Sequence, residues 1–278
     1  MSSAFARPLR LFVLMAVLAA FPTACARNPG PEPATVTEAG FAPGRVDREQ
    51  NQRTLDTLRR TPLTGRVMRV GTIEDIRLAP GEVILTFDDG PAGGNTRRIL
   101  DALDDKGVKA TFLMVGEMAR SRPGLAREVV ARGHTVGSHT HGHPNLAAMS
   151  HGRAIDEIAR GERALREAGI DDVPFFRFPY LADTAALRRH LAERGIVVLD
   201  VDIDSKDYFR ISPARVASQT MARLRARGSG IILFHDLHAR TATMLPSFLN
   251  MLEREGYRVV ALRPAREGPP TAILASSR

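Results

Sequence analysis

The feature that most constrains the fold is a regular alternation of short strand-like runs and longer helix-like runs, beginning at about residue 81. The strand-like runs are rich in aliphatic, β-branched and aromatic residues. They are Val83–Phe87, Ala110–Val115, Thr135–Ser138, Phe175–Phe178, Ile196–Val201, Ile231–Phe234 and Arg258–Leu262. Most are separated by runs with apolar residues at helical spacing, and a glycine closes each helix before the next strand.

This alternation predicts parallel strands with helices packed outside them. The helix-like runs are Asn95–Lys106, Gly124–Arg132, Ser150–Ala168, Thr184–Arg194, Ser212–Arg227 and Thr241–Glu255. The fold class is therefore α/β. The expected architecture is a compact, distorted (β/α) barrel of about seven parallel strands, and an open doubly wound sheet is the alternative. In either case we expect the functional site at the carboxyl ends of the strands.

The chain begins with a segment typical of export. Arg7 and Arg10 precede an almost purely apolar run, Leu11–Phe21, which is short for a bilayer span but suits a secretory signal. Ala24-Cys25-Ala26 matches a signal-peptidase site, whereas Thr23-Ala24-Cys25 resembles a lipoprotein cleavage box that would leave Cys25 lipidated as a membrane tether. Both interpretations predict an exported protein, periplasmic or associated with the cell envelope.

These patterns divide the chain into four parts. Residues 1–26 are the signal, and residues 27–80 are a flexible leader rich in Pro, Ala, Gly and Thr near its start, with a short helix at most in its middle part. Short β-like pieces around Val67–Val70 are expected either to extend the edge of the domain or to lie across its surface. Residues 81–264 are the catalytic domain, and residues 265–278 are a tail. The formal net charge of +8 suits an anionic surface or polymer. A concentrated basic stripe with interleaved aromatic residues is missing from the sequence, so nucleic acid is not an expected partner.

Two adjacent carboxylates, Asp88 and Asp89, follow the first strand-like run and precede Gly90-Pro91. An ordinary Asp-Gly turn would also have this pattern. Alternatively, one acid binds a metal and the other moves a proton, since a nearby cation lets both stay ionised. This second interpretation requires further ligands at the same edge of the sheet.

Candidate ligands follow the third strand-like run in the segment S-H-T-H-G-H-P. His139 and His143 lie four residues apart and can face one way on a turn. Two imidazoles and one carboxylate would leave an open position for water, the pattern of a catalytic zinc site. We expect His141 to be a solvent-facing loop residue, and His134, His151, His190 and His238 to lie on the surface.

Two further segments place charged groups after strands. Arg177 emerges from an apolar run and would need a partner if buried, for which Asp88 is available. His235 directly follows another apolar run and can exchange a proton near neutral pH. An acid from the loop after the fifth strand-like run would orient it, whereas Asp200 and Asp202 in that region are expected to be solvated.

Five segments, taken together and in order, resemble the polysaccharide deacetylases, carbohydrate esterase family 4 or the NodB-homology domain. They are T-F-D-D-G, H-T-H-G-H, R-F-P-Y, D-S-K-D-Y and L-F-H-D, within about Glu82 to Leu262. The resemblance implies a metal-dependent hydrolase that removes N-acetyl groups from an amino-sugar polysaccharide such as peptidoglycan or chitin-like oligomers, releasing acetate. The implied metal is zinc, with cobalt or manganese as substitutes.

The resemblance also implies a role for each matched residue. Asp88 would be the catalytic base and Asp89 a metal ligand. His139 and His143 would be the other two ligands, and Arg177 would orient Asp88.

The remaining roles lie on the later segments. The backbone N–H of Tyr180 would help to hold the oxyanion, and Leu233 would line the pocket for the acetyl methyl. His235 would be the general acid, tuned by Asp204. Tyr208 would lie in the substrate groove, where the family usually has Trp, and Phe178 replaces a frequent Pro.

These two departures lie in the substrate groove, so the motifs leave more than one substrate class open. A polysaccharide O-acetyl esterase is a second interpretation, and a catalytically silent carbohydrate-binding protein of the envelope is a third. The intact set of base, acid and ligands argues against the third, because a binding protein has no need of both base and acid.

Overall fold

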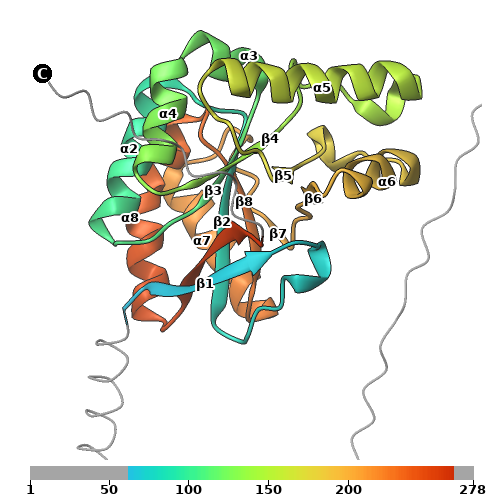
Figure 1. The fold of residues 1–278 in the computed structure, drawn as a ribbon. Helices are drawn as coiled ribbons and strands as arrows, with labels where there is room; N and C mark the ends of the chain where they lie inside the picture. Colours follow the sequence, from blue (N-terminus) through green and yellow to red (C-terminus); the bar gives the residue numbers. More distant parts are fainter. Residues whose placement is uncertain (1–61, 266–278) are drawn as a thin grey trace, which may run out of the picture. The chain divides into compact units, whose positions relative to one another are not determined.

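The computed structural model describes residues 62–265, which form one nine-stranded sheet with helices around it (Figure 1). The strands are β1 (Thr64–Val70), β2 (Glu82–Asp88), β3 (Thr111–Met114), β4 (Thr135–Ser138), β5 (Phe175–Phe176), β6 (Val197–Val198), β7 (Ile203–Asp204), β8 (Gly230–His235) and β9 (Arg258–Pro264). Every pairing between them is parallel. The predicted α/β class is therefore confirmed.

Seven α-helices connect the strands in the described part of the chain, together with three short 3-10 turns. The α-helices are α2 (Gly93–Asp105), α3 (Gly116–Ser121), α4 (Pro123–Ala131), α5 (His151–Glu167), α6 (Ala185–Glu193), α7 (Pro213–Arg227) and α8 (Ala239–Arg254). The turns are η1 (Ile73–Asp75), η2 (Leu146–Ala148) and η3 (Pro179–Leu181). In Figure 1, α2, α4 and α8 lie together on one side of the strands and α5 and α6 on the other.

The strand order is that of a barrel opened at one seam. The path β2-β3-β4-β5-β6 follows the sequence, and β8 pairs with the other side of β2 and with β7. The order 7-8-2-3-4-5-6 is a cyclic permutation of the sequence, as in a barrel, whereas a doubly wound sheet reverses direction midway. Among the described residues no pairing joins β6 to β7, so the sheet is not closed.

The chain itself spans the seam between β6 and β7. At the start of the connecting segment, Leu199 N donates to Phe176 O at 2.8 Å, and at its end Asp202 N donates to Ile231 O at 3.0 Å. Each end of the segment is thereby bonded to a strand on its own side of the seam. The carbonyl groups of Leu199 and Asp200 in this segment accept hydrogen bonds from the Arg177 side chain.

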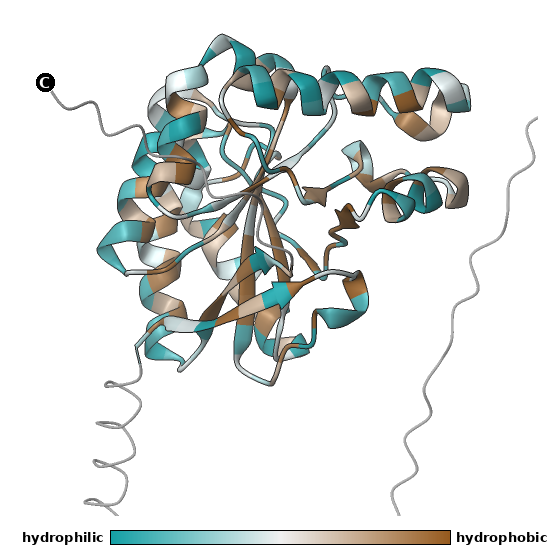
Figure 2. Ribbon diagram, in the orientation of Figure 1, coloured by the Kyte–Doolittle hydropathy of each residue, from teal (hydrophilic) through white to brown (hydrophobic). Residues whose placement is uncertain are grey.

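The core is built from the inward faces of the strands and the apolar faces of the helices (Figure 2). Phe87 is stacked between Phe112 and Phe234, with ring centroids 5.1 and 5.7 Å away, and Phe248 of α8 packs edge-on against Phe234 at 5.4 Å. All four rings are buried, each contributing roughly 150–250 Å² of removed surface. The core thus fixes β2 and β8 rigidly just before Asp88 and His235.

The helices begin and end as their sequences predict, within a few residues. Ser212 caps α7 by accepting a hydrogen bond from Arg215 N at 3.3 Å, and Pro213 occupies the first turn. Gly228 ends the same helix in the left-handed conformation, with φ 87°. The short helix α3 was not expected, because six residues carry too little apolar periodicity to be recognised.

The structure corrects three details of the predicted architecture. β1 pairs with β9 from Thr64 to Val70, so the β-like part of the leader extends the edge of the sheet and the domain begins before residue 81. β9 pairs with β2 only at Glu82 and Val83, and its other neighbour is β1. It is therefore not one of the strands of the barrel. The seventh strand of the barrel is instead β7, which is two residues long and lies in the segment expected to be a loop. A two-residue strand has no periodicity to detect.

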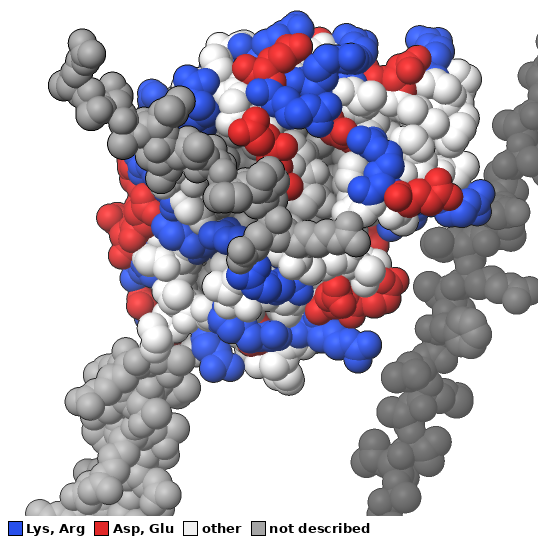
Figure 3. Space-filling view, in the orientation of Figure 1, with Lys and Arg blue, Asp and Glu red and all other residues white. Residues whose placement is uncertain are grey.

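Several expectations concern residues outside the described range. The signal, the fate of Cys25 and most of the leader lie within residues 1–61, and the tail lies almost wholly within residues 266–278. Among the described helices, none has the length and apolar character needed to cross a membrane. On the face of the molecule in Figure 3, basic side chains are interspersed with acidic ones.

Candidate active site

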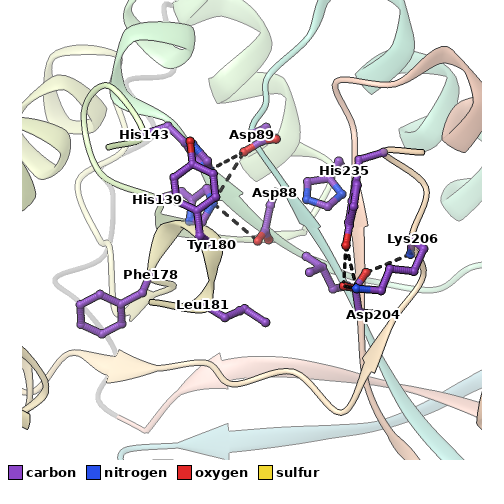
Figure 4. Close-up of a pocket in the computed structure, with 12 residues that line it drawn as sticks. Asp88, Asp89, His139, His143, Phe178, Tyr180, Leu181, Asp204, Lys206 and His235 are labelled. Carbon is purple, nitrogen blue, oxygen red and sulfur yellow. Dashed lines mark hydrogen bonds and ion pairs between the residues drawn. The ribbon is translucent and has the colours of Figure 1, made fainter. Parts of the chain in front are cut away.

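A cavity of about 550 Å³ opens at the carboxyl ends of the strands, where the sequence analysis expects the site (Figure 4). It is lined by Asp88, Asp89, His139, His143, Phe178, Tyr180, Leu181, Asp204, Lys206, Tyr208, Leu233 and His235. Nine of the ten predicted site residues line it. Arg177 lies beneath the cavity, buried against Asp88.

Asp89, His139 and His143 converge on one side of the cavity with the geometry of a metal site. The Nε2 atoms of His139 and His143 lie 3.6 and 3.4 Å from Asp89 Oδ1. Ligand atoms bonded to a tetrahedral zinc ion stand roughly 3.3 Å apart, given Zn–N and Zn–O lengths near 2 Å. Asp89 Oδ1 is buried without a hydrogen-bond partner among the described residues, and a cation would satisfy it. The three residues therefore fit a divalent metal.

The ring of His139 is prepared for ligation by its surroundings. Its Nδ1 lies 2.8 Å from Arg177 O, a contact that makes Nδ1 the donor and leaves Nε2 as a lone-pair donor to a metal. Burial lowers the pKa of His139 to about 3, so the imidazole is neutral at any physiological pH. A neutral, oriented imidazole is the form that binds a metal.

Asp88 is held by Arg177, as predicted. Arg177 Nη1 donates to Asp88 Oδ1 and to Thr86 Oγ1, both at 2.8 Å. Its Nε and Nη2 donate to Leu199 O and Asp200 O in the segment that spans the seam of the sheet. These bonds use four of the five guanidinium N–H groups, and Arg177 is only 1% exposed. Burial raises the pKa of Asp88, and the Arg177 charge opposes that effect.

His235 ends β8 in register with Asp88 at the end of β2, so the two lie side by side on adjacent strands. Its Nδ1 is 2.7 Å from Asp207 Oδ1, and its backbone N–H donates to Asp207 Oδ2 at 2.8 Å. Burial alone would lower the pKa of His235, but the hydrogen bond and charge of Asp207 raise it to about 9. The ring is therefore a proton donor near neutral pH.

The acid that tunes His235 is thus Asp207, and the assignment of Asp204 to that role is wrong. Asp204 Oδ2 instead pairs with Lys206 Nζ at 2.7 Å and accepts from the Tyr208 hydroxyl at 3.0 Å. Lys206 has φ 61°, and this turn carries Asp207 inward. Asp207 is 0% exposed and also accepts from Thr241 Oγ1 at 2.6 Å. Both acids lie in the same D-S-K-D segment, so spacing alone could not separate them.

The matches to known proteins agree with this geometry. The sequence profile of the polysaccharide deacetylases matches residues 76–199. A chitin deacetylase of Colletotrichum lindemuthianum is 33% identical over 214 residues, which cover 73% of this chain and 86% of that protein. The chain belongs to the polysaccharide deacetylase family.

Solved structures of the family are similar in fold. A family 4 carbohydrate esterase from Streptomyces lividans, in complex with acetate, has a TM-score of 0.59 and 33% identity, covering 66% of this chain and 93% of that one. A peptidoglycan deacetylase from Bdellovibrio bacteriovorus has a TM-score of 0.64 and 30% identity, covering 79% of this chain and 69% of that one.

Three residues of this polysaccharide deacetylase form the walls of the cavity. Tyr180 has φ 58° and ψ 11°, and its exposed ring packs edge-on against His143 with centroids 4.8 Å apart. Leu233 is buried on β8, between Thr86 and Asp204 in register. Tyr208 presents its ring edge-on to His235 at 5.5 Å. The Tyr180 and Tyr208 rings and the Leu233 side chain thus give the cavity apolar surface beside the candidate metal ligands, Asp88 and His235.

Two histidines differ from the sequence prediction. His141 is 4% exposed, with Nε2 3.8 Å from Glu117 Oε1, instead of facing solvent. His134 is also 4% exposed and accepts a hydrogen bond from Ala110 N at 3.1 Å. Both are buried by elements distant in the sequence, which a local pattern cannot reveal. His151 is exposed, as expected.

Proposed function

We propose that this protein removes N-acetyl groups from an amino-sugar polysaccharide and releases acetate. The proposal rests mainly on the position of Asp88. Its carboxylate lies between the three candidate metal ligands and His235, and all of these groups line the same cavity (Figure 4). Hydrolysis of an amide needs a base for the attacking water and an acid for the leaving amine. The relatives named for chitin and peptidoglycan support an N-acetylated polymer as the substrate class.

Asp89, His139 and His143 would hold zinc, with cobalt or manganese as substitutes. Bound there, zinc would supply Lewis acidity toward the acetamido carbonyl and toward the attacking water. Asp88 accepts the proton of that water, and Arg177 keeps the carboxylate aimed at the cavity. The Tyr180 N–H donates to the developing oxyanion, a contribution of about 3 kcal/mol for a well-placed donor.

His235 completes the reaction by giving its proton to the departing nitrogen. The Asp207 carboxylate holds the ring by Nδ1 and leaves Nε2 for the substrate. Leu233 lies where the acetyl methyl would pack, and Tyr208 and Tyr180 offer ring surfaces to the sugar. The product is a free amine, which makes the polymer more cationic.

The experiment that tests this function is acetate release from N-acetylglucosamine oligomers and from peptidoglycan. The purified protein is assayed after chelation and again after zinc is restored. Zinc-dependent release supports the proposal, and the preferred polymer identifies the substrate. If metal-loaded protein releases no acetate from either polymer but does so from O-acetylated polysaccharide, the protein is an esterase instead.

Replacement of Asp88 by Asn separates an enzyme from a carbohydrate-binding protein. The amide of the Asp88→Asn variant keeps the shape of the carboxylate but cannot take a proton, so acetate release is expected to fall by about 10²-fold or more. Zinc affinity should change little, because Asp88 is not in the triad. Full acetate release by the variant would rule out Asp88 as the base.

We also propose that the protein is exported to the periplasm or cell envelope, on the evidence of residues 1–26. Mass spectrometry of the mature N-terminus would distinguish cleavage after Ala26 from a lipidated Cys25. An unprocessed N-terminus that retains Met1 would contradict export.

A further inference from the structure

The loop that carries two of the metal ligands, residues 139–143, has an unusual backbone. Thr140 has φ 68° and His143 has φ 60°, both in the left-handed region. A β-branched residue is rare there, and such conformations cost about 1–3 kcal/mol each. They persist only where surrounding contacts enforce them. The contacts that enforce this conformation therefore also set the positions of His139 and His143.

One set of contacts comes from the start of α3. Gly116 N donates to Thr140 O at 2.9 Å, and Glu117 N donates to His141 O at 3.0 Å. Within the loop, Thr140 Oγ1 accepts from His143 N at 3.0 Å. These bonds fix the first part of the loop and the amide of His143, but they do not involve the amide of Gly142.

The Gly142 amide is held by α5, through Glu157. Glu157 Oε1 accepts from Gly142 N at 2.6 Å, and Oε2 pairs with Arg160 Nη1 at 3.1 Å. Glu157 is 6% exposed, and a carboxylate is seldom so buried unless its oxygens accept hydrogen bonds or pair with a cation. A charged acceptor makes a hydrogen bond about twice as strong as a neutral one. Glu157 thus binds the loop one residue before the ligand His143.

The same helix presses against the loop at Gly161, one turn further along. A Cβ added to Gly161 would lie 2.6 Å from Thr140 C and 2.9 Å from His141 N. The close approach of α5 to the loop therefore requires glycine here. It also brings the Glu157 carboxylate within reach of the Gly142 amide.

We propose that Glu157 is a positioning residue of the metal centre, which keeps the loop in the strained conformation that directs the His143 ring at Asp89. The inference rests on the metal site of the proposed function, but it concerns zinc binding and not the reaction. Without this acceptor the Gly142 amide loses its partner and His143 is free to relax out of the left-handed region. The triad then loses its pre-organisation toward the metal.

The test is the zinc affinity of the full chain, measured by competition with a chromophoric chelator. Glu157→Ala is expected to bind zinc roughly tenfold or more weakly, as for other residues that orient metal ligands. Glu157→Gln keeps an acceptor oxygen and should restore most of the affinity. Glu162→Ala is the matched control, since Glu162 is equally buried on α5 but pairs with Arg194.

A second pair of variants keeps the proposal testable if Glu157→Ala fails to fold. Gly161→Ala pushes the loop away from α5 and should weaken zinc binding. Gly152→Ala adds the same methyl to the same helix, where no atom lies within 4 Å, and should leave zinc affinity unchanged.

The result that would overturn the proposal is equal zinc affinity in Glu157→Ala and Glu162→Ala, or in Gly161→Ala and Gly152→Ala. Zinc is the only ligand used, so this outcome is independent of any polysaccharide. A protein that binds zinc as expected but releases no acetate would contradict the proposed function and leave the role of Glu157 supported.

Discussion

At the scale of single residues, the site depends on which buried groups are partnered. His235 carries a positive charge in a largely buried place, because Asp207 lies under it and Asp88 and Asp89 lie nearby. Burial alone would raise the pKa of Asp207, but the hydrogen bond and charge of His235 lower it. The pair therefore stays ionised, and Thr241 Oγ1 donates a further hydrogen bond to Asp207 Oδ2, which also accepts from the backbone N–H of His235.

Replacement of Asp207 by Asn is expected to shift the pH dependence of acetate release. The pKa of His235 is raised to about 9, so its acid form is present below that pH and is lost above it. Loss of the Asp207 charge lowers that pKa, because the charge favours the protonated ring. The alkaline limb of kcat/KM against pH should then move to lower pH.

Asp204→Asn is the control for this experiment. Asp204 pairs with Lys206 and Tyr208, so its replacement should leave the alkaline limb in place. A shift in the Asp204 variant and none in the Asp207 variant would contradict the contact seen in the structure. The same comparison decides between the acid expected from the sequence and the acid found beneath His235.

At the scale of elements, the short strands act as rigid supports for the side chains that follow them. β4 lies between β3 and β5 and leads directly into His139. Gly137 in this strand lets its neighbours approach closely, since a Cβ there would lie 2.6 Å from both Leu113 Cδ1 and Phe175 O. The strand interior is otherwise a place where glycine weakens a sheet.

Replacement of Gly137 by Ala is therefore expected to destabilise the protein. Overpacking of this kind costs about 1–3 kcal/mol, because backbone atoms must move to admit the methyl group. Denaturant unfolding measures the change in the free energy of unfolding. Gly124→Ala is the control, since nothing lies within 4 Å of a Cβ there. Equal stability of the two variants would show that β4 accommodates the methyl group.

At the scale of the whole molecule, the sheet places the metal ligands, and its apolar core does not include them. Phe87, Phe112 and Phe234 form a continuous apolar stack through adjacent strands, independent of the triad. The open seam between β6 and β7 is occupied by the segment whose carbonyls bind Arg177. The irregularity of the barrel is thus part of how Asp88 is oriented.

Zinc is expected to stabilise the folded protein without being needed for folding. A ligand that binds only the folded state adds about 2.7 kcal/mol when its free concentration is roughly 100 times Kd. The free energy of unfolding should therefore rise with zinc in the unmodified protein. Asp89→Asn removes one ligand charge and should lose most of that increase. An equal increase in both proteins would place the bound zinc elsewhere.

Most of the strands and helices, and the order of the chemical groups along the chain, are predictable from the sequence. Alternating apolar runs predict strands and helices because burial imposes a period on each. Parallel strands bring their carboxyl ends to one edge, so the acids, histidines and Arg177 that follow successive strands must meet there. These are consequences of local pattern and of topology, and the structure places the residues accordingly.

The neighbours of each chemical group depend on how distant segments pack in the folded protein. Asp204 and Asp207 are three residues apart in one turn, and the left-handed Lys206 directs the second toward His235. The burial of His141, the pairing of β1 with β9 and the Glu157 contact with Gly142 join segments distant in the sequence. Burial and contact depend on packing between such segments, and the hydrophobic periodicity of a single segment does not predict them.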